Sequence, residues 1–202
     1  MKRTNGMLTL AFVFAAVPNP AHAGLGVSVT APIRHGIDAF CSGTQRVKSP
    51  PYLFARTQME GARMSAWART TRAAEEKIQN NAHFIAGEIG SLQALGKKPV
   101  LATLAQVSGT GDGATEAEYC YRSGRLVRMR TTIDSVTDEM QWVGTMYFLE
   151  GQSLGPFLQS KDLTRHRTTN PTEPRFKEPV YTTPARLPFF PLFTAATKKD
   201  RL

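Results

Sequence analysis

The chain has 202 residues, 41% of them hydrophobic, and its 25 Lys and Arg against 16 Asp and Glu give a formal charge of +9. This length suits one domain of ordinary size. Beyond the first 23 residues, no stretch approaches the roughly 18 consecutive apolar residues that a membrane-spanning helix needs, so the composition predicts a protein that is soluble once released.

Residues 1–23 have the pattern of a secretory signal peptide. Two basic residues near the start precede an apolar run of eleven residues, 7–17, and an Ala-x-Ala sequence ends at Ala23. The run is too short to serve as a permanent membrane anchor. We therefore expect cleavage between Ala23 and Gly24 and a secreted or periplasmic mature protein.

Removal of the two basic residues of this segment leaves a formal charge of +7. Outside the cytoplasm, the expected partner of such a chain is an anionic envelope component or an acidic protein, and no DNA is expected. The alternative is that the charge mainly aids solubility.

The mature part contains both cysteines of the chain, Cys41 and Cys120. An even count in an exported chain predicts one disulfide, although two free buried thiols remain the alternative. A zinc site needs more soft ligands than these two residues offer, so neither a metal nor a cofactor is expected.

One amphipathic helix is predicted over residues 58–80, after a segment, 24–57, that is rich in Gly, Pro and Ser. Apolar and small residues recur there at spacings of three and four, which is typical of one helix face. They are Met64, Trp67, Thr71, Ala74 and Ile78.

Strand patterns dominate the rest of the mature chain up to residue 165. Residues 100–107 and 141–149 read as strands, and Ser123-Gly124 between two further strands indicates a hairpin. Short turns between successive strands favour an antiparallel meander. The predicted fold class is α+β, an antiparallel β-meander of four to five strands with one main amphipathic helix packed on it.

The hairpin around Ser123-Gly124 contains the candidate binding surface. Counting from a two-residue turn places Tyr119 opposite Arg128, and Cys120 opposite Val127 on the other face. One face would then be aromatic and cationic, and it would either bind an anion or remain solvated. The candidate binding residues are Tyr119, Tyr121, Arg122, Arg125, Arg128 and Arg130.

One string resembles a catalytic motif, G-x-S-x-G at Gly151–Gly155. A strand before it and a helix after it would make Ser153 the nucleophile of a small serine hydrolase, with Asp162 and His166 as partners. Asp162 and His166 are only four residues apart, and short motifs also arise by chance, so a glycine-flanked turn is the preferred interpretation.

The C-terminal segment 166–202 is predicted to be an extended, Pro-rich tail, since its prolines exclude interior helix and central strand. Its large apolar residues should nevertheless be covered, by the protein's own sheet or by a partner. They are Leu187, Phe189, Phe190, Leu192 and Phe193.

These observations predict an exported, soluble, non-enzymatic protein that binds a ligand or takes part in assembly of the cell envelope. Two alternatives remain open at this point. One is the serine hydrolase that uses Ser153, and the other is a secreted inhibitor that presents the basic hairpin to another protein.

Overall fold

The computed structural model describes residues 31–45, 51–80, 84–108, 113–135, 140–162, 168–169 and 178–199. The expected signal peptide, 1–23, and the candidate histidine, His166, lie outside the described residues.

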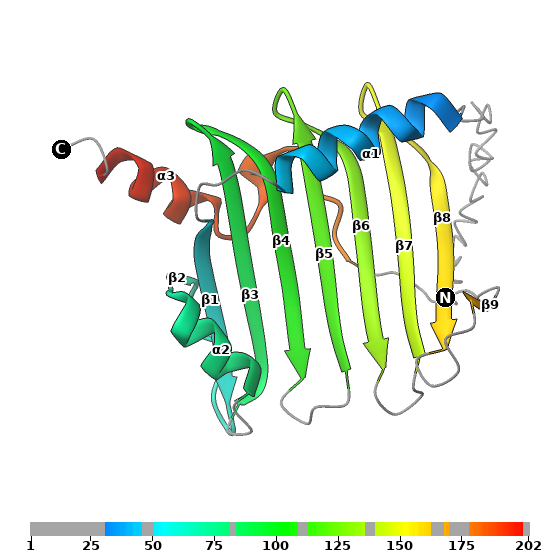
Figure 1. The fold of residues 1–202 in the computed structure, drawn as a ribbon. Coiled ribbons are helices and arrows are strands. Elements are labelled where there is room, and N and C mark those ends of the chain that lie inside the picture. The colour runs from blue at the N-terminus through cyan, green and yellow to red at the C-terminus, as the bar shows by residue number, and fades with distance from the viewer. Residues whose placement is uncertain are drawn as a thin grey trace, which may run out of the picture.

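One antiparallel sheet of nine strands forms the described part of the fold, in the order β2-β1-β3-β4-β5-β6-β7-β8-β9 (Figure 1). The α+β class and the antiparallel arrangement are confirmed, but the sheet is larger than the four to five strands predicted. The strands are β1 (Tyr52–Met59), β2 (Ala68–Arg69), β3 (Phe84–Leu95), β4 (Lys98–Ser108), β5 (Gly113–Arg122), β6 (Arg125–Ser135), β7 (Met140–Leu149), β8 (Gln152–Asp162) and β9 (Thr168–Thr169).

Three tight turns lie at one end of the sheet, at the top of Figure 1, and we call this the turn end. Both residues of the β5–β6 turn, Ser123 and Gly124, have positive φ values of 54° and 76°. Glu150 and Gly151 in the β7–β8 turn repeat this with 52° and 86°. Two successive residues with positive φ define the type I′ turn, whose twist matches that of the strands.

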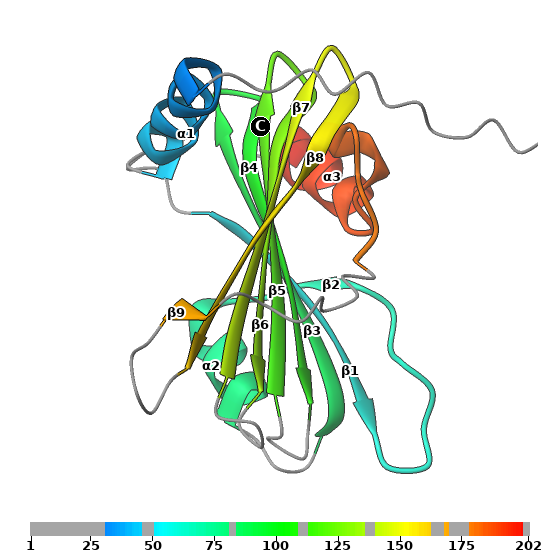
Figure 2. The same cartoon turned by 90° about the vertical axis from the view of Figure 1, so that its right-hand side faces the viewer.

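Helices cover both faces of the sheet near the turn end. Helix α1 (Ala31–Gln45) crosses one face, and the 3-10 turn η1 (Pro184–Arg186) and helix α3 (Phe190–Lys199) lie against the other (Figure 2). Helix α2 (Arg72–Asn80) packs on β1 and β3. The close approach at β3 requires a glycine, because a β-carbon on Gly87 would lie 2.7 Å from the side chain of Ile78.

The predicted helix over 58–80 is wrong in its first half. Strand β1 continues to Met59, Gly61 turns with a φ of 72°, and only residues 72–80 are helical. The apolar spacing in this region reflects two separate contacts. Ile78 packs from α2 onto the sheet, whereas Trp67 packs against the core on the other face.

Helix α1 forms in a segment whose composition did not predict a helix. Its buried residues, Ile37, Cys41 and Thr44, recur at spacings of four and three, as the covered stripe of a surface helix does. Gly36 and Gly43 have no neighbouring atoms within 4 Å at the position of a β-carbon, so they lie on the open side of the helix.

The C-terminal segment is not extended throughout, contrary to the prediction. Helix α3 begins at Phe190, so Pro191 occupies its first turn, where a missing N–H group breaks no helical hydrogen bond. Leu187, Phe189 and Phe193 are buried in the hydrophobic core on that face of the sheet.

A disulfide between Cys41 and Cys120 ties α1 to β5, with Cα atoms 5.9 Å apart, and confirms the predicted bond. Both cysteines are fully buried, in a small second core with Ile37, Leu101 and Tyr147. The sheet therefore has one hydrophobic cluster on each face, and α1 is covalently fixed over the smaller one.

Candidate functional site

A β-bulge between β5 and β6 changes which hairpin residues share a face. Cys120 pairs with Arg128 and Tyr119 with Met129, while Tyr121 still pairs with Leu126. The register therefore shifts by one residue next to the turn, and beyond it every side chain of β6 is reversed relative to the predicted arrangement. The predicted surface of tyrosines and arginines together does not exist.

Tyr119 and Tyr121 face the C-terminal segment and are 0% exposed. Their hydroxyl groups donate hydrogen bonds to the backbone carbonyls of Pro179 and Tyr181, at 2.9 and 3.1 Å. Burial raises the pKa of both phenols above the usual value. In this position both side chains anchor the segment before η1 and are closed to a ligand.

Arg128 lies on the opposite face and is itself buried, at the centre of a partly exposed polar cluster below α1. Its Nη1 donates to Asp38 Oδ1 at 2.8 Å, and its Nη2 donates to Glu118 Oε1 at 2.6 Å. The hydroxyl of Tyr147 donates to the other Asp38 oxygen at 2.9 Å, and Gln45 donates to Glu118 at 2.7 Å. These bonds connect α1 with β5, β6 and β7.

The charged state of Arg128 is secured by these partners. Only 8% of its side chain is exposed, and burial disfavours the cation, but the hydrogen bonds to Asp38 and Glu118 outweigh burial and raise the pKa of Arg128. Burial and the bond to Asp38 also raise the pKa of Tyr147. The cluster therefore holds a permanent, oriented guanidinium group beneath α1.

A cleft of about 510 Å³ opens beside this cluster, between α1 and strands β6–β8, and we call it the arginine cleft. Its lining residues include Arg34, Ser42, Arg128, Arg130, Thr145 and Phe157. The guanidinium carbon of Arg34 lies 4.5 Å from the centroid of the Phe157 ring, which holds that cation in place.

Two of the guanidinium groups in the arginine cleft lack a carboxylate partner. Within the described ranges, neither Arg34 nor Arg130 forms an ion pair, whereas Arg128 forms two. The Nε atoms of Arg34 and Arg128 are also covered by protein and have no hydrogen-bond partner in the described part of the chain. Each of these N–H groups is therefore free to donate a hydrogen bond to water or to a ligand.

Arg122 and Arg125 lie elsewhere, at the β5–β6 turn, where both are exposed. The guanidinium carbon of Arg122 is 5.4 Å from the ring centroid of Phe40 in α1. The six predicted binding residues thus fall into three places: the buried tyrosines, the turn end, and the arginine cleft with Arg128 and Arg130.

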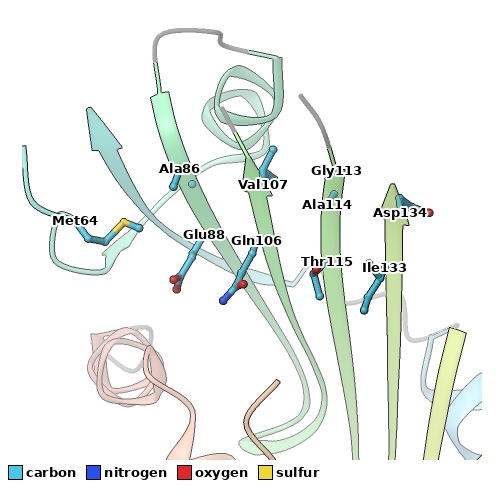
Figure 3. Close-up of a pocket in the computed structure, with 11 residues that line it drawn as sticks. Met64, Ala86, Glu88, Gln106, Val107, Gly113, Ala114, Thr115, Ile133 and Asp134 are labelled. Carbon is cyan, nitrogen blue, oxygen red and sulfur yellow. The ribbon is translucent and has the colours of Figure 1, made fainter. Parts of the chain in front are cut away.

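A second cleft of about 460 Å³ lies on the face that carries α3, toward the end opposite the turn end. Figure 3 shows Glu88, Gln106, Thr115 and Ile133 extending to one side of the sheet, with Met64 approaching from the β1–β2 loop. The Glu88 carboxylate is already paired with Arg56 through bonds of 2.8 and 2.9 Å. Asp134 also lines this cleft, and its carboxylate accepts a hydrogen bond from Gln141 at 2.7 Å. The charges of this cleft are therefore carboxylates and one Arg56–Glu88 pair, which do not favour an anionic ligand.

The G-x-S-x-G string does not form a nucleophile elbow. Gly151 belongs to the β7–β8 turn, and Ser153 continues into strand β8 instead of a helix. Asp162 ends the same strand nine residues later, roughly 30 Å away at the usual rise per residue. The Ser153 hydroxyl accepts a hydrogen bond from the Gly155 N–H at 3.4 Å, which is the contact of a local turn.

Sequence reasoning missed Arg34, Asp38, Glu118 and Tyr147, which complete the arginine cleft and its polar cluster. Arg34 and Asp38 are four residues apart in α1, next to the buried Ile37 and Cys41. Prediction of that helix would have placed both on the side that faces the sheet.

Among the described residues, no group of three or more His, Cys, Asp or Glu side chains could hold a metal ion. The described helices include none of the length and apolar character needed to cross a bilayer. Comparison of the chain with models of protein families, with curated proteins and with solved structures finds no match.

Proposed function

We propose that the protein is an exported, non-enzymatic binding protein that holds a small anionic group of an envelope component in the arginine cleft. The observation that carries this proposal is the pair of guanidinium groups, on Arg34 and Arg130, that line one cleft without a carboxylate partner in the described chain. Export rests on the pattern of residues 1–23.

The geometry of the cleft favours an oxyanion. Three cations, Arg34, Arg128 and Arg130, line the cleft together with one carboxylate, Asp38. Glu118 pairs with Arg128, and Glu116 interacts electrostatically with Arg130 without forming an ion pair in the described chain. A planar guanidinium group fits carboxylate and phosphate groups with two parallel hydrogen bonds. Because the Arg34 cation is stacked on Phe157, little side-chain freedom is lost when a ligand binds.

The test uses inorganic sulfate, inorganic phosphate and galacturonate as probes, with the arginine Nε–Hε signals followed by NMR. We expect titration with at least one probe to shift the Arg34 and Arg130 signals, and the shift to weaken as sodium chloride rises. The Arg34→Gln/Arg130→Gln variant should lose binding, and the matched Arg63→Gln/Arg69→Gln variant should retain it. Equal affinity in all three proteins, or unshifted Arg34 and Arg130 signals, would exclude the arginine cleft as the site.

A further inference from the structure

The turn end combines exposed apolar side chains with positive charge. Leu95 and Leu149, which flank the β3–β4 and β7–β8 turns, are 51% and 44% exposed. Including the β5–β6 turn, the three turns at this end carry one exposed carboxylate, Glu150. They also carry four exposed cations, Lys97, Lys98, Arg122 and Arg125.

Topology fixes this arrangement. Successive strands of the meander run in opposite directions, so the β3–β4, β5–β6 and β7–β8 turns must lie at the same end, as Figure 1 shows. Each turn has two residues, so the flanking side chains stand close to the tip. Gly96 takes a φ of 62° at the first position of the β3–β4 turn, which leaves Lys97 at the second.

A largely apolar groove lies between helix α1 and the β5–β6 and β7–β8 turns. Its volume is about 470 Å³, and its lining includes the apolar Ile33, Ile37, Phe40 and Leu149 and the charged Arg122, Arg125 and Glu150. Ile33 in the first turns of α1 is itself 38% exposed. The groove therefore extends the apolar surface of the turn tips onto the helix.

We propose that the turn end docks on a bilayer surface that contains anionic lipids. Leu95, Leu149 and Ile33 would enter the headgroup region, while Lys97, Lys98, Arg122 and Arg125 would contact lipid phosphates. Apolar side chains flanked by Lys and Arg are the combination that binds peripheral proteins reversibly to such surfaces. Charge complementarity and the position of the apolar residues at projecting tips, instead of in one closed pocket, favour a lipid surface over a folded protein partner.

This docking is independent of the arginine cleft. Arg34 and Arg130 lie beside β6–β8 on the face under α1, and neither lines the groove at the turn end. Substitutions in the arginine cleft should therefore leave vesicle binding at the turn end unchanged, and substitutions at the turn end should leave the cleft intact.

The experiment measures cosedimentation of the oxidised protein with vesicles of phosphatidylcholine alone and with vesicles that contain about 30% phosphatidylglycerol. We expect binding to the anionic vesicles only, weakening as salt is raised from about 0.05 to 0.5 M. Each cation near an anionic surface contributes roughly fivefold in affinity, so Lys97→Gln/Lys98→Gln should bind roughly 25-fold more weakly. Leu95→Ser/Leu149→Ser should also bind more weakly at unchanged charge.

Two controls separate docking from general charge attraction. Arg63→Gln/Arg69→Gln removes the same charge from the β1–β2 region, and Arg34→Gln/Arg130→Gln removes it from the arginine cleft. Both should bind vesicles like the unmodified protein. An equal loss in these controls, or full binding by the Lys97→Gln/Lys98→Gln variant, would overturn the proposal. Binding to soluble heparin without binding to anionic vesicles would overturn it in favour of a polyanion partner.

Discussion

The ring of Phe189 fills the space beside Gly90 that a side chain would occupy. A β-carbon built on Gly90 would overlap this ring, which stacks on Phe54 with centroids 5.1 Å apart and an interplanar angle of 18°. The C-terminal segment thus packs against β3 where Gly90 has no side chain. Substitution of either Gly90 or Phe189 tests this contact.

We expect Phe189→Ala to lower the free energy of unfolding by about 3–5 kcal/mol, because it opens a cavity in the core. Gly90→Ala should cost about 1–3 kcal/mol through overpacking. Since Phe189→Ala removes the clash, the double variant should lose less than the sum of the single variants, as measured by urea denaturation. Strict additivity would contradict the contact.

The ion cluster of Arg128 predicts a large difference between two arginines of one strand. Arg128→Met should lower stability by about 3 kcal/mol, since Asp38 and Glu118 lose their common partner. Arg130→Gln, at an exposed position of the same strand, should change it by less than about 0.5 kcal/mol.

Thermal unfolding by circular dichroism compares these two variants with the unmodified protein. Asp38→Asn/Glu118→Gln in the Arg128→Met background should restore part of the loss, because no uncompensated carboxylate then remains. Equal melting temperatures for Arg128→Met and Arg130→Gln would show that the cluster contributes nothing to stability.

The disulfide should stabilise the fold by an amount similar to that of the Arg128 cluster. It closes a loop over a sequence separation of 79, for which the chain-entropy model gives a stabilisation of about 4 kcal/mol. The melting temperature should therefore fall in reductant and in the Cys41→Ser/Cys120→Ser variant, and reductant should have no further effect on that variant. Free alkylation of both thiols in unreduced protein would disprove the bond.

Alkaline pH should unfold the protein through its buried tyrosines. The folded-state pKa values of Tyr119 and Tyr121 are raised above the unfolded value of about 10, so the folded state retains protons that the unfolded state releases. Their contribution to stability is complete below pH 10 and is lost as the pH rises further.

Absorbance at 295 nm should show fewer than the five tyrosines of the chain ionising before a cooperative alkaline transition. Tyr121→Phe removes one of these protons, so the transition should move to higher pH even though loss of the bond to Tyr181 costs about 1 kcal/mol. A gradual titration of all five in folded protein would contradict the burial.

Local patterns predicted the Ser123-Gly124 turn and the antiparallel sheet, because both depend on residue type at short range. The disulfide was predicted from the cysteine count alone, because only one pairing of two cysteines is possible. The arginine cleft depends on a β-bulge: Val127 is an extra residue in β6 between Leu126, which pairs with Tyr121, and Arg128, which pairs with Cys120. The alternation of apolar and polar residues does not reveal such a bulge. Helix α1 was missed because its two glycines weaken the pattern, although the buried stripe of Ile37 and Cys41 is regular.

The spacing from Met64 to Ile78 predicted one helix because two unrelated contacts, of Trp67 and of Ile78, happened to match its period. A proline count excluded α3 because it ignored position, and Pro191 is harmless in the first turn. For residues 64–67 the missing information was tertiary, namely which face of the sheet each residue reaches. For α3 it was local, namely the place of Pro191 in the helix.

The bond between Cys41 and Cys120 also constrains the order of events as the chain matures. Helix α1 precedes the sheet in the chain, yet the strands it packs on, β4 and β6, and its covalent partner in β5 are all made after it. Cys41 therefore waits, unpaired, until the middle of the sheet exists. A chain interrupted before residue 120 therefore cannot form this bond, because it has no second thiol.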